Sequence, residues 1–97
     1  MDFLKRIKKL IKNEDDCIIY WSALEGAEKL GFCQDDMINC ISSLKSKDYK
    51  GKKRSEKSDE MLYVFKPKLG TLELYIKIKL LEGKVHVLSF KSSTDRS

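Results

Sequence analysis

The chain has 97 residues, enough for one small domain with a single hydrophobic core and too few for a second. Residues 1–44 carry a net charge of −2 and residues 45–97 a net charge of +7, so the basic surface is expected in the second half. A positive field on one side attracts phosphate backbones or anionic membranes, docks an acidic protein, or simply keeps a small domain soluble.

The first predicted element is a short amphipathic helix near the N-terminus. Apolar residues recur there at helical spacing, at Phe3, Leu4, Ile7, Leu10 and Ile11, with basic residues on the other side. The stripe is short, which favours packing in the core over binding to a membrane. Because the segment contains no continuous apolar run, we expect neither a signal peptide nor a membrane span, and a cytoplasmic protein.

Two more helices are predicted after a short apolar strand at residues 17–21. Ser22 and Glu25 have the spacing of a capping box, which predicts a helix over about 22–30. A further helix is expected from the acidic pair at 35–36 to near Ser46. Its apolar stripe consists of Met37, Cys40, Ile41 and Leu44.

The cysteines and the histidine do not predict a metal site. Cys17, Cys33 and Cys40 lack C-x-x-C spacing, and the single histidine, His86, does not complete a zinc site with them. We therefore expect reduced thiols in the core and no metal or other cofactor.

After residue 60 the hydrophobic period changes from that of a helix to that of a strand. Strands are predicted at 60–69, 71–80 and 84–91, and a tight turn at Glu82 and Gly83 joins the last two. The order of elements predicts an α+β fold in which helices cover one face of an antiparallel sheet.

Alternation assigns the strand side chains to a covered and an open face. Tyr75 and Lys91 fall on the open face. His86 alternates with them, on the face of Leu88 and Phe90, and is expected to be a partly buried or edge histidine rather than a catalytic base. We place the aromatic side chains of the first strand, with Met61, inward and Lys66 outward. The candidate site is a cluster of lysines and tyrosines: Tyr49, Lys50, Lys66, Lys68, Tyr75, Lys77, Lys79 and Lys91.

This cluster suits RNA chemistry. The sequence has no metal motif, no nucleophile with a histidine base and no glycine-rich phosphate loop. RNA supplies its own nucleophile in the 2′-hydroxyl, lysines stabilise the charge of the phosphorane, and a tyrosine or lysine among cations can transfer protons. Basic sheets with tyrosines also occur in non-catalytic RNA-binding proteins, so both possibilities stay open.

Several stretches in register resemble one known family. They are SALEGAEKLGFCQDDMINCISSLKSKDYKG, YVFKPKL, LYIKI and LSFK, at nearly constant spacing from about Ser22 to Lys91. Together they are similar to the MqsR (motility quorum-sensing regulator) family of bacterial toxins, with one extra residue in the turn at Glu82 and Gly83.

The resemblance implies a RelE-like ribonuclease fold and the toxin of a type II toxin–antitoxin system, which cuts messenger RNA near GC dinucleotides without a metal or the ribosome. It also implies an antitoxin of the MqsA type that binds both the toxin and DNA, so the toxin itself is not expected to bind DNA directly. The family's functional positions correspond to Tyr49, Lys50, Tyr75 and Lys91. A family glutamine is replaced by Leu62, whose side chain can neither donate nor accept a hydrogen bond. Either the glutamine is dispensable, or the base preference has shifted, or the activity of this copy is weakened.

The resulting hypothesis is a single toxin domain over residues 1–97 that binds RNA on the open face. Tyr75 is the predicted acid or base, Lys50 its partner in proton transfer or charge stabilisation, and Lys91 a phosphate clamp. Residues 45–60 are expected to form a basic loop and residues 92–97 a flexible tail. The predicted RNA-binding residues are Tyr49, Lys52, Lys53, Arg54, Lys66, Lys68 and Lys77.

Two alternatives remain at this point. A non-catalytic RNA-binding module would bind RNA in a salt-sensitive way and leave it intact. A pure interaction protein would bind an acidic antitoxin-like partner tightly and RNA negligibly.

Overall fold

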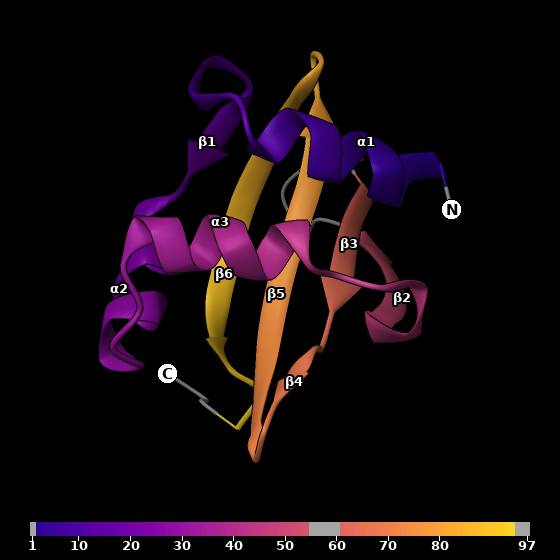
Figure 1. The fold of residues 1–97 in the computed structure, drawn as a ribbon. Coiled ribbons are helices and arrows are strands. Elements are labelled where there is room, and N and C mark those ends of the chain that lie inside the picture. Colours follow the sequence, from indigo (N-terminus) through magenta and orange to yellow (C-terminus); the bar gives the residue numbers. More distant parts are fainter. Residues whose placement is uncertain (1, 55–60, 95–97) are drawn as a thin grey trace.

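The computed structural model describes residues 2–54 and 61–94, in which three α-helices lie against a sheet of six strands (Figure 1). The helices are α1 (Asp2–Ile11), α2 (Trp21–Lys29) and α3 (Gln34–Ser42), with short 3₁₀ helices η1 (Glu14–Asp16) and η2 (Ser46–Asp48). The strands are β1 (Cys17–Ile19), β2 (Tyr49–Arg54), β3 (Met61–Phe65), β4 (Lys68–Leu69), β5 (Leu72–Leu81) and β6 (Lys84–Ser92). Within these ranges no helix is long and apolar enough to cross a membrane.

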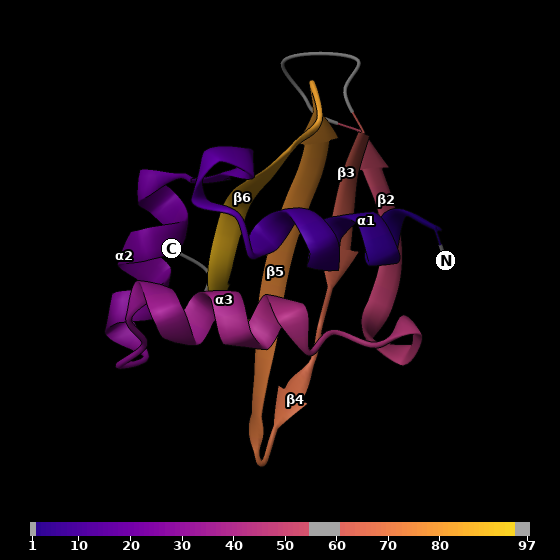
Figure 2. The same cartoon turned by 45° about the horizontal axis from the view of Figure 1, so that its top comes forward.

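The sheet has the strand order β1-β6-β5-β3-β2, and β4 pairs with β5. Paired strands run antiparallel except β1 and β6, which are parallel. Helices α1 and α3 lie across one face of the sheet, and α2 lies beside β6 (Figure 1 and Figure 2). The α+β class and the layer of helices on one face are therefore confirmed.

The core lies between this face and the helices, and β5 supplies its centre. Leu74, Ile76 and Ile78 of β5 have no exposed surface and belong to one cluster with side chains of α1 and α3. Tyr75 and Lys77, which alternate with them, are partly exposed, as predicted. Burial of one set of side chains thus determines which set the open face presents.

Strand β3 is apolar on both of its faces. Phe65 is fully buried and Tyr63 packs against the core, which confirms the inward placement of these aromatic side chains, whereas Met61 is exposed. On the opposite face Leu62 and Val64 are also buried, although they lie outside the main cluster. The open face is therefore not polar throughout.

The predicted capping box of α2 is wrong. The helix begins at Trp21, so Ser22 lies inside the first turn, and the predicted strand over 17–21 ends at Ile19. The Ser22 hydroxyl instead donates to the carbonyl oxygen of Leu88 in β6 at 2.7 Å. Glu25 Oε1 accepts a hydrogen bond from Trp21 Nε1 at 2.6 Å. Both side chains are thus used in tertiary and side-chain contacts rather than in capping.

Helix α3 has an acidic N-terminal turn and ends earlier than predicted. The carboxylate of Asp36 accepts hydrogen bonds from the backbone N–H of Cys33 at 3.0 Å and from its thiol at 3.2 Å, and these bonds lower the pKa of Asp36. The helix ends at Ser42 rather than near Ser46 because the chain turns into η2, where Asp48 Oδ2 accepts from the backbone N–H of Lys45 at 2.9 Å.

The basic loop predicted for residues 45–60 is wrong in its described part, which forms η2 and the edge strand β2. The charged run has no apolar alternation that would predict a strand. It forms one because pairing with β3 provides hydrogen-bond partners for backbone groups of β3 that would otherwise lack them. Residues 55–60 lie outside the described residues, as does the predicted tail from residue 95. Ser92 still belongs to β6, and Ser93 N–H donates to the Glu73 carbonyl at 2.9 Å.

The predicted turn between β5 and β6 is confirmed. Glu82 and Gly83 both adopt positive φ, at 53° and 73°, which is the backbone of the tight turn favoured in two-residue hairpins.

Gly26 allows α2 to approach β6 closely. A Cβ atom on this residue would lie 2.3 Å from the carbonyl oxygen of Phe90 and 3.1 Å from Cβ of Lys91. Strand β1 pairs with β6 at residues 85–87. The contacts of α2 with β6 lie just beyond, at residues 88–91, so the helix covers the stretch of β6 that β1 leaves unpaired. The contact therefore sets the position of the backbone that carries Lys91.

We expect Gly26→Ala to destabilise the protein, although alanine is the better helix former. On an unobstructed helix the change would stabilise by about 1 kcal/mol. Here the added methyl group overlaps a backbone oxygen, and overpacking of this kind costs roughly 1–3 kcal/mol. Urea unfolding followed by circular dichroism measures the difference.

The matched control is Glu28→Ala on the exposed side of the same helix, which is expected to change the free energy of unfolding by about 0.5 kcal/mol or less. If Gly26→Ala were as stable as the wild type or more stable, the close approach of α2 and β6 would be contradicted.

Candidate functional site

Tyr75 lies between two lysines on the open face. It pairs with Lys91 in the β5–β6 register, and Lys91 Nζ is 5.8 Å from the centroid of the Tyr75 ring. Lys66 follows the end of β3, and its Nζ is 5.9 Å from the same centroid. At this separation an ammonium group is attracted to an aromatic ring. The structure thus brings together three residues that the sequence assigned to the site.

A β-bulge in β2 determines where Lys50 lies. Tyr49 pairs with Phe65 and Gly51 with Val64, so Lys50 is the extra residue with no partner on β3. Gly51 has a φ of 121°, a conformation that favours glycine. Lys50 is exposed at this bulge.

Lys50 and Lys66 line one cleft of about 280 Å³ at the end of β3. The backbone N–H of Lys66 donates to the carbonyl oxygen of Asp48 at 2.8 Å, which ties η2 to this end of the sheet. The four other residues of the cleft are Lys47, Asp48, Lys68 and Glu73. Lysines outnumber carboxylates here, so the cleft suits an anionic ligand such as a phosphate group.

Three of these lining residues, Lys47, Asp48 and Glu73, were not predicted. The sequence offered no pattern for the first two, because η2 brings them into place by a local turn. Glu73 alternates with Leu72 and Leu74 and so falls on the open face, but its pairing with Lys68 depends on β4, which is not distinct from the strand predicted over 60–69.

Tyr49 does not share the open face. Its ring packs against Phe3 of α1, with centroids 5.1 Å apart, and against the buried Phe65 at 5.6 Å. The bulge separates it from Lys50, so the two neighbouring residues predicted for one site serve different parts of the structure. Tyr49 contributes to the edge of the core.

Beyond the bulge the alternation of β2 is inverted. Lys53 pairs with Leu62 and therefore lies on the open face, whereas Lys52 pairs with Tyr63 on the side of the helices. Of Arg54 only the backbone pairing with Met61 is described. Lys52 and Lys53, both predicted to bind RNA, therefore lie on opposite faces of the sheet.

Leu62, which replaces the family glutamine, shares the open face but lies away from Tyr75. Val64 pairs with Lys77 of β5, and in an antiparallel pair Leu62 therefore lies towards Lys79, in the direction opposite to Tyr75. Lys77 lies on this face between Val64 and Ser89, and Lys79 Nζ is 5.9 Å from the Tyr20 ring.

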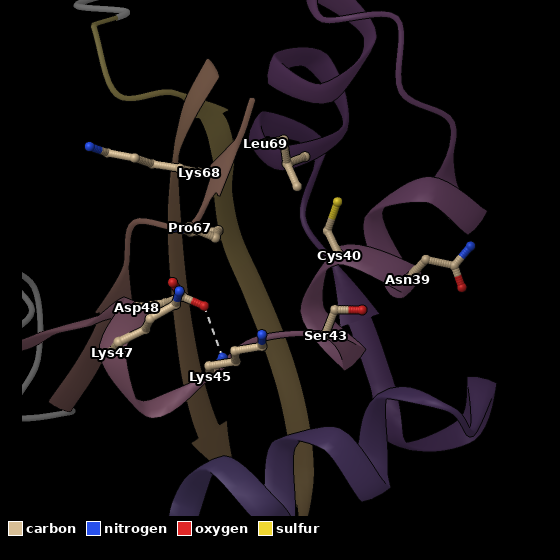
Figure 3. A pocket seen from close by; sticks show the side chains of 9 residues that line it. All are labelled: Asn39, Cys40, Ser43, Lys45, Lys47, Asp48, Pro67, Lys68 and Leu69. Atoms are coloured by element: carbon tan, nitrogen blue, oxygen red, sulfur yellow. Dashed lines mark hydrogen bonds between the residues drawn. The ribbon is translucent and has the colours of Figure 1, made fainter. Parts of the chain in front are cut away.

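Two further cavities flank the site. One of about 400 Å³ lies between α3, η2 and β4 and shares Lys47, Asp48 and Lys68 with the first cleft (Figure 3). The other, also about 400 Å³, lies between α2 and β6. It is lined by Ser22, Glu25, Gly26, Lys29, Ser89, Phe90 and Lys91. An isolated glycine within a predicted helix, such as Gly26, is the signal in the sequence from which this close packing could be expected.

In the described ranges no group of three or more histidine, cysteine or acidic side chains is arranged to hold a metal ion. His86 is 9% exposed, in agreement with the predicted burial, and its Nδ1 lies 3.2 Å from the hydroxyl of Tyr20. Its predicted face is wrong, because the register of β5 and β6 shifts between Lys77 and Ile78 and His86 pairs with Lys79 on the open face. The thiols of Cys17 and Cys40 are half-buried, but Cys33 is exposed, so its predicted place in the core is wrong.

The model of one protein family matches residues 2–92 of this chain. Its description is motility quorum-sensing regulator, toxin of MqsA. A search of curated proteins finds no match. The match extends from the first turn of α1 to the end of β6 and therefore includes every described element of the fold.

The three thiols are expected to differ in reactivity. Burial raises the pKa of Cys17 and of Cys40, and the negative charge of Asp36 raises that of Cys40 further. Because the thiolate is the reactive form, iodoacetamide at about pH 8 should alkylate the exposed Cys33 first. The alkylation rates of Cys17 and Cys40 should increase as the pH rises towards their raised pKa values. Peptide mapping by mass spectrometry measures the order. Labelling of Cys40 before Cys33 would contradict the described packing, and urea-unfolded protein provides the control in which all three react alike.

Proposed function

This chain belongs to the motility quorum-sensing regulator family of toxins, and from that premise we propose that it is an endoribonuclease that cuts messenger RNA without a metal ion and without the ribosome. The observation that carries the proposal is the position of Tyr75 between Lys66 and Lys91, on the sheet face opposite α1 and α3. The RNA would lie across this open face.

In the proposed reaction RNA supplies the nucleophile. The 2′-oxygen attacks the adjacent phosphorus, and the bond from phosphorus to the 5′-oxygen of the next nucleotide breaks. The products are a 2′,3′-cyclic phosphate and a 5′-hydroxyl. One proton leaves the 2′-hydroxyl and one reaches the 5′-oxygen, so the protein needs only proton-transfer groups and cations for the phosphorane.

The side chains support distinct roles. Tyr75 is the proposed acid or base, because its ring lies on the open face with the ammonium groups of two lysines 5.8 Å and 5.9 Å from its centroid. Lys91 is the proposed phosphate clamp, and Lys66 joins it because its ammonium group lies at a similar distance from the ring. Lys50 is the proposed partner in proton transfer or charge stabilisation, since it shares a cleft with Lys66.

The remaining basic residues of this surface are proposed to hold the RNA backbone. Lys53 and Lys77 lie on the open face, and Lys68 lines the cleft with Lys50. We also propose cleavage next to GC dinucleotides and inhibition by an antitoxin of the MqsA type. The family description names MqsA, which supports the partner, and the GC preference is what the resemblance to the family implies.

The first test is incubation of a long single-stranded RNA with the purified protein in EDTA, followed by mapping of the product ends. We expect discrete cuts that leave 2′,3′-cyclic phosphate and 5′-hydroxyl ends. Tyr75→Phe and Lys50→Ala should each lower the rate, by about 10²- to 10⁴-fold if the residue transfers a proton. Lys9→Ala removes the same charge from the exposed side of α1 and should leave the rate unchanged.

Intact RNA despite salt-sensitive binding would overturn the enzymatic proposal and favour a non-catalytic RNA-binding module. Negligible affinity for RNA together with tight binding of an antitoxin would favour a pure interaction protein. Equal activity of Tyr75→Phe and wild type would remove Tyr75 from the reaction.

Leu62→Gln tests what the departure from the family means. Because Leu62 lies away from Tyr75, we expect the substitution to change KM or the set of cut positions and to leave kcat unaltered. Leu62 is 7% exposed, so an amide there should also lower the stability by roughly 1–3 kcal/mol unless it finds a hydrogen-bond partner. A large rise in kcat would show instead that leucine weakens the chemical step in this chain.

A further inference from the structure

Trp21 is an unusually exposed aromatic residue. Its side chain is 71% exposed at the start of α2, although tryptophan is on average among the more buried residue types. The core does not require it, because the buried residues of α2 are Ala23, Gly26 and Ala27. Neither the fold nor the proposed reaction uses this indole ring.

The ring is held in place rather than free to rotate. Trp21 Nε1 donates a hydrogen bond to Glu25 Oε1 at 2.6 Å, one helical turn further on. Helix α2 is itself anchored on β6 by the contact of Gly26 with Phe90 and by the bond from Ser22 to Leu88. An exposed aromatic ring that is fixed in this way loses little side-chain entropy when a flat ligand stacks on it.

The ring is connected through Glu25 to a cleft that reaches the candidate site. Lys91, next to Tyr75, lines the cleft of about 400 Å³ between α2 and β6. Glu25, which holds the indole ring, and Lys29 line the same cleft. The cleft holds two lysines, Lys29 and Lys91, against this one carboxylate, so its charge favours a phosphate backbone.

We propose that Trp21 is a stacking platform for an unpaired base of the RNA, whose backbone runs from Lys91 along this cleft. The inference rests on the proposed function, because it takes single-stranded RNA as the ligand. Basic grooves beside exposed aromatic rings bind single strands in this way, and each stacked base contributes roughly 1–3 kcal/mol. The platform would extend the bound strand beyond the scissile phosphate.

The test uses the intrinsic fluorescence of the protein, because Trp21 is its single tryptophan. The probe is a short 2′-O-methyl RNA of mixed sequence, which has no free 2′-hydroxyl and so cannot be cut by the proposed reaction. We expect titration with this probe to quench the emission. Inorganic polyphosphate, which has charge but no bases, should compete for the lysines without equal quenching.

The variants separate stacking from other effects. Trp21→Ala should weaken binding of the probe about 5- to 150-fold, the equivalent of one lost stack, while Trp21→Phe should recover most of the affinity. Ile18→Ala alters the neighbouring exposed apolar side chain of β1, which is 40% exposed, and should leave the affinity unchanged. Circular dichroism checks that all variants are folded.

The outcomes distinguish this inference from the proposed function. Probe binding without quenching, equal quenching by polyphosphate, or unaltered affinity in Trp21→Ala would overturn the platform, while RNA cleavage by the same protein would still support the function. If Ile18→Ala and Trp21→Ala weakened the binding of a protein partner equally and neither changed the affinity for the RNA probe, the platform would be overturned in favour of a protein-docking patch. Quenching and the Trp21→Ala loss without any cleavage would support the platform and refute the enzyme.

Discussion

The pairing of β5 with both β3 and β6 is the constraint on which the candidate site depends. The core takes Leu74, Ile76 and Ile78 of β5, and alternation then leaves Tyr75 on the opposite face. The partner strands bring Lys91 and Lys66 to either side of it. A slip of one residue would exchange apolar for polar side chains along the whole strand, so the apolar core and the basic face are specified by the same register.

Much of this could be predicted from the sequence because it depends on periodicity. The helices, the long strands, the turn at Glu82 and Gly83, and the open-face position of Tyr75 all follow from spacings along the chain. The bulge at Lys50 does not, because one extra residue inverts the alternation of β2 without any apolar pattern to show it. Tyr49 is predicted to bind RNA from a basic loop, whereas packing against Phe3 of a distant helix places it at the edge of the core.

The contact between α2 and β6 joins the fold to the site. Gly26 has no side chain to keep the helix away, so the backbone that carries Lys91 lies directly against the helix. The cleft between these elements and the cleft around Lys50 lie on opposite sides of Tyr75. Strands β5 and β6 therefore carry the central tyrosine and Lys91, and Lys66 follows the end of β3. The flanking clefts combine strands with a helix or a short turn.

The order of the strands also bears on how copies of this chain behave towards one another. An open sheet edge can pair with the edge of another molecule and start aggregation. Here β1 is only three residues long, and α2 covers the next stretch of β6. At the other edge β2 carries lysines at 50, 52 and 53 together with a bulge. Positive charge on that strand thus repels an identical edge, so lysines proposed to act on RNA would also protect the sheet against self-association.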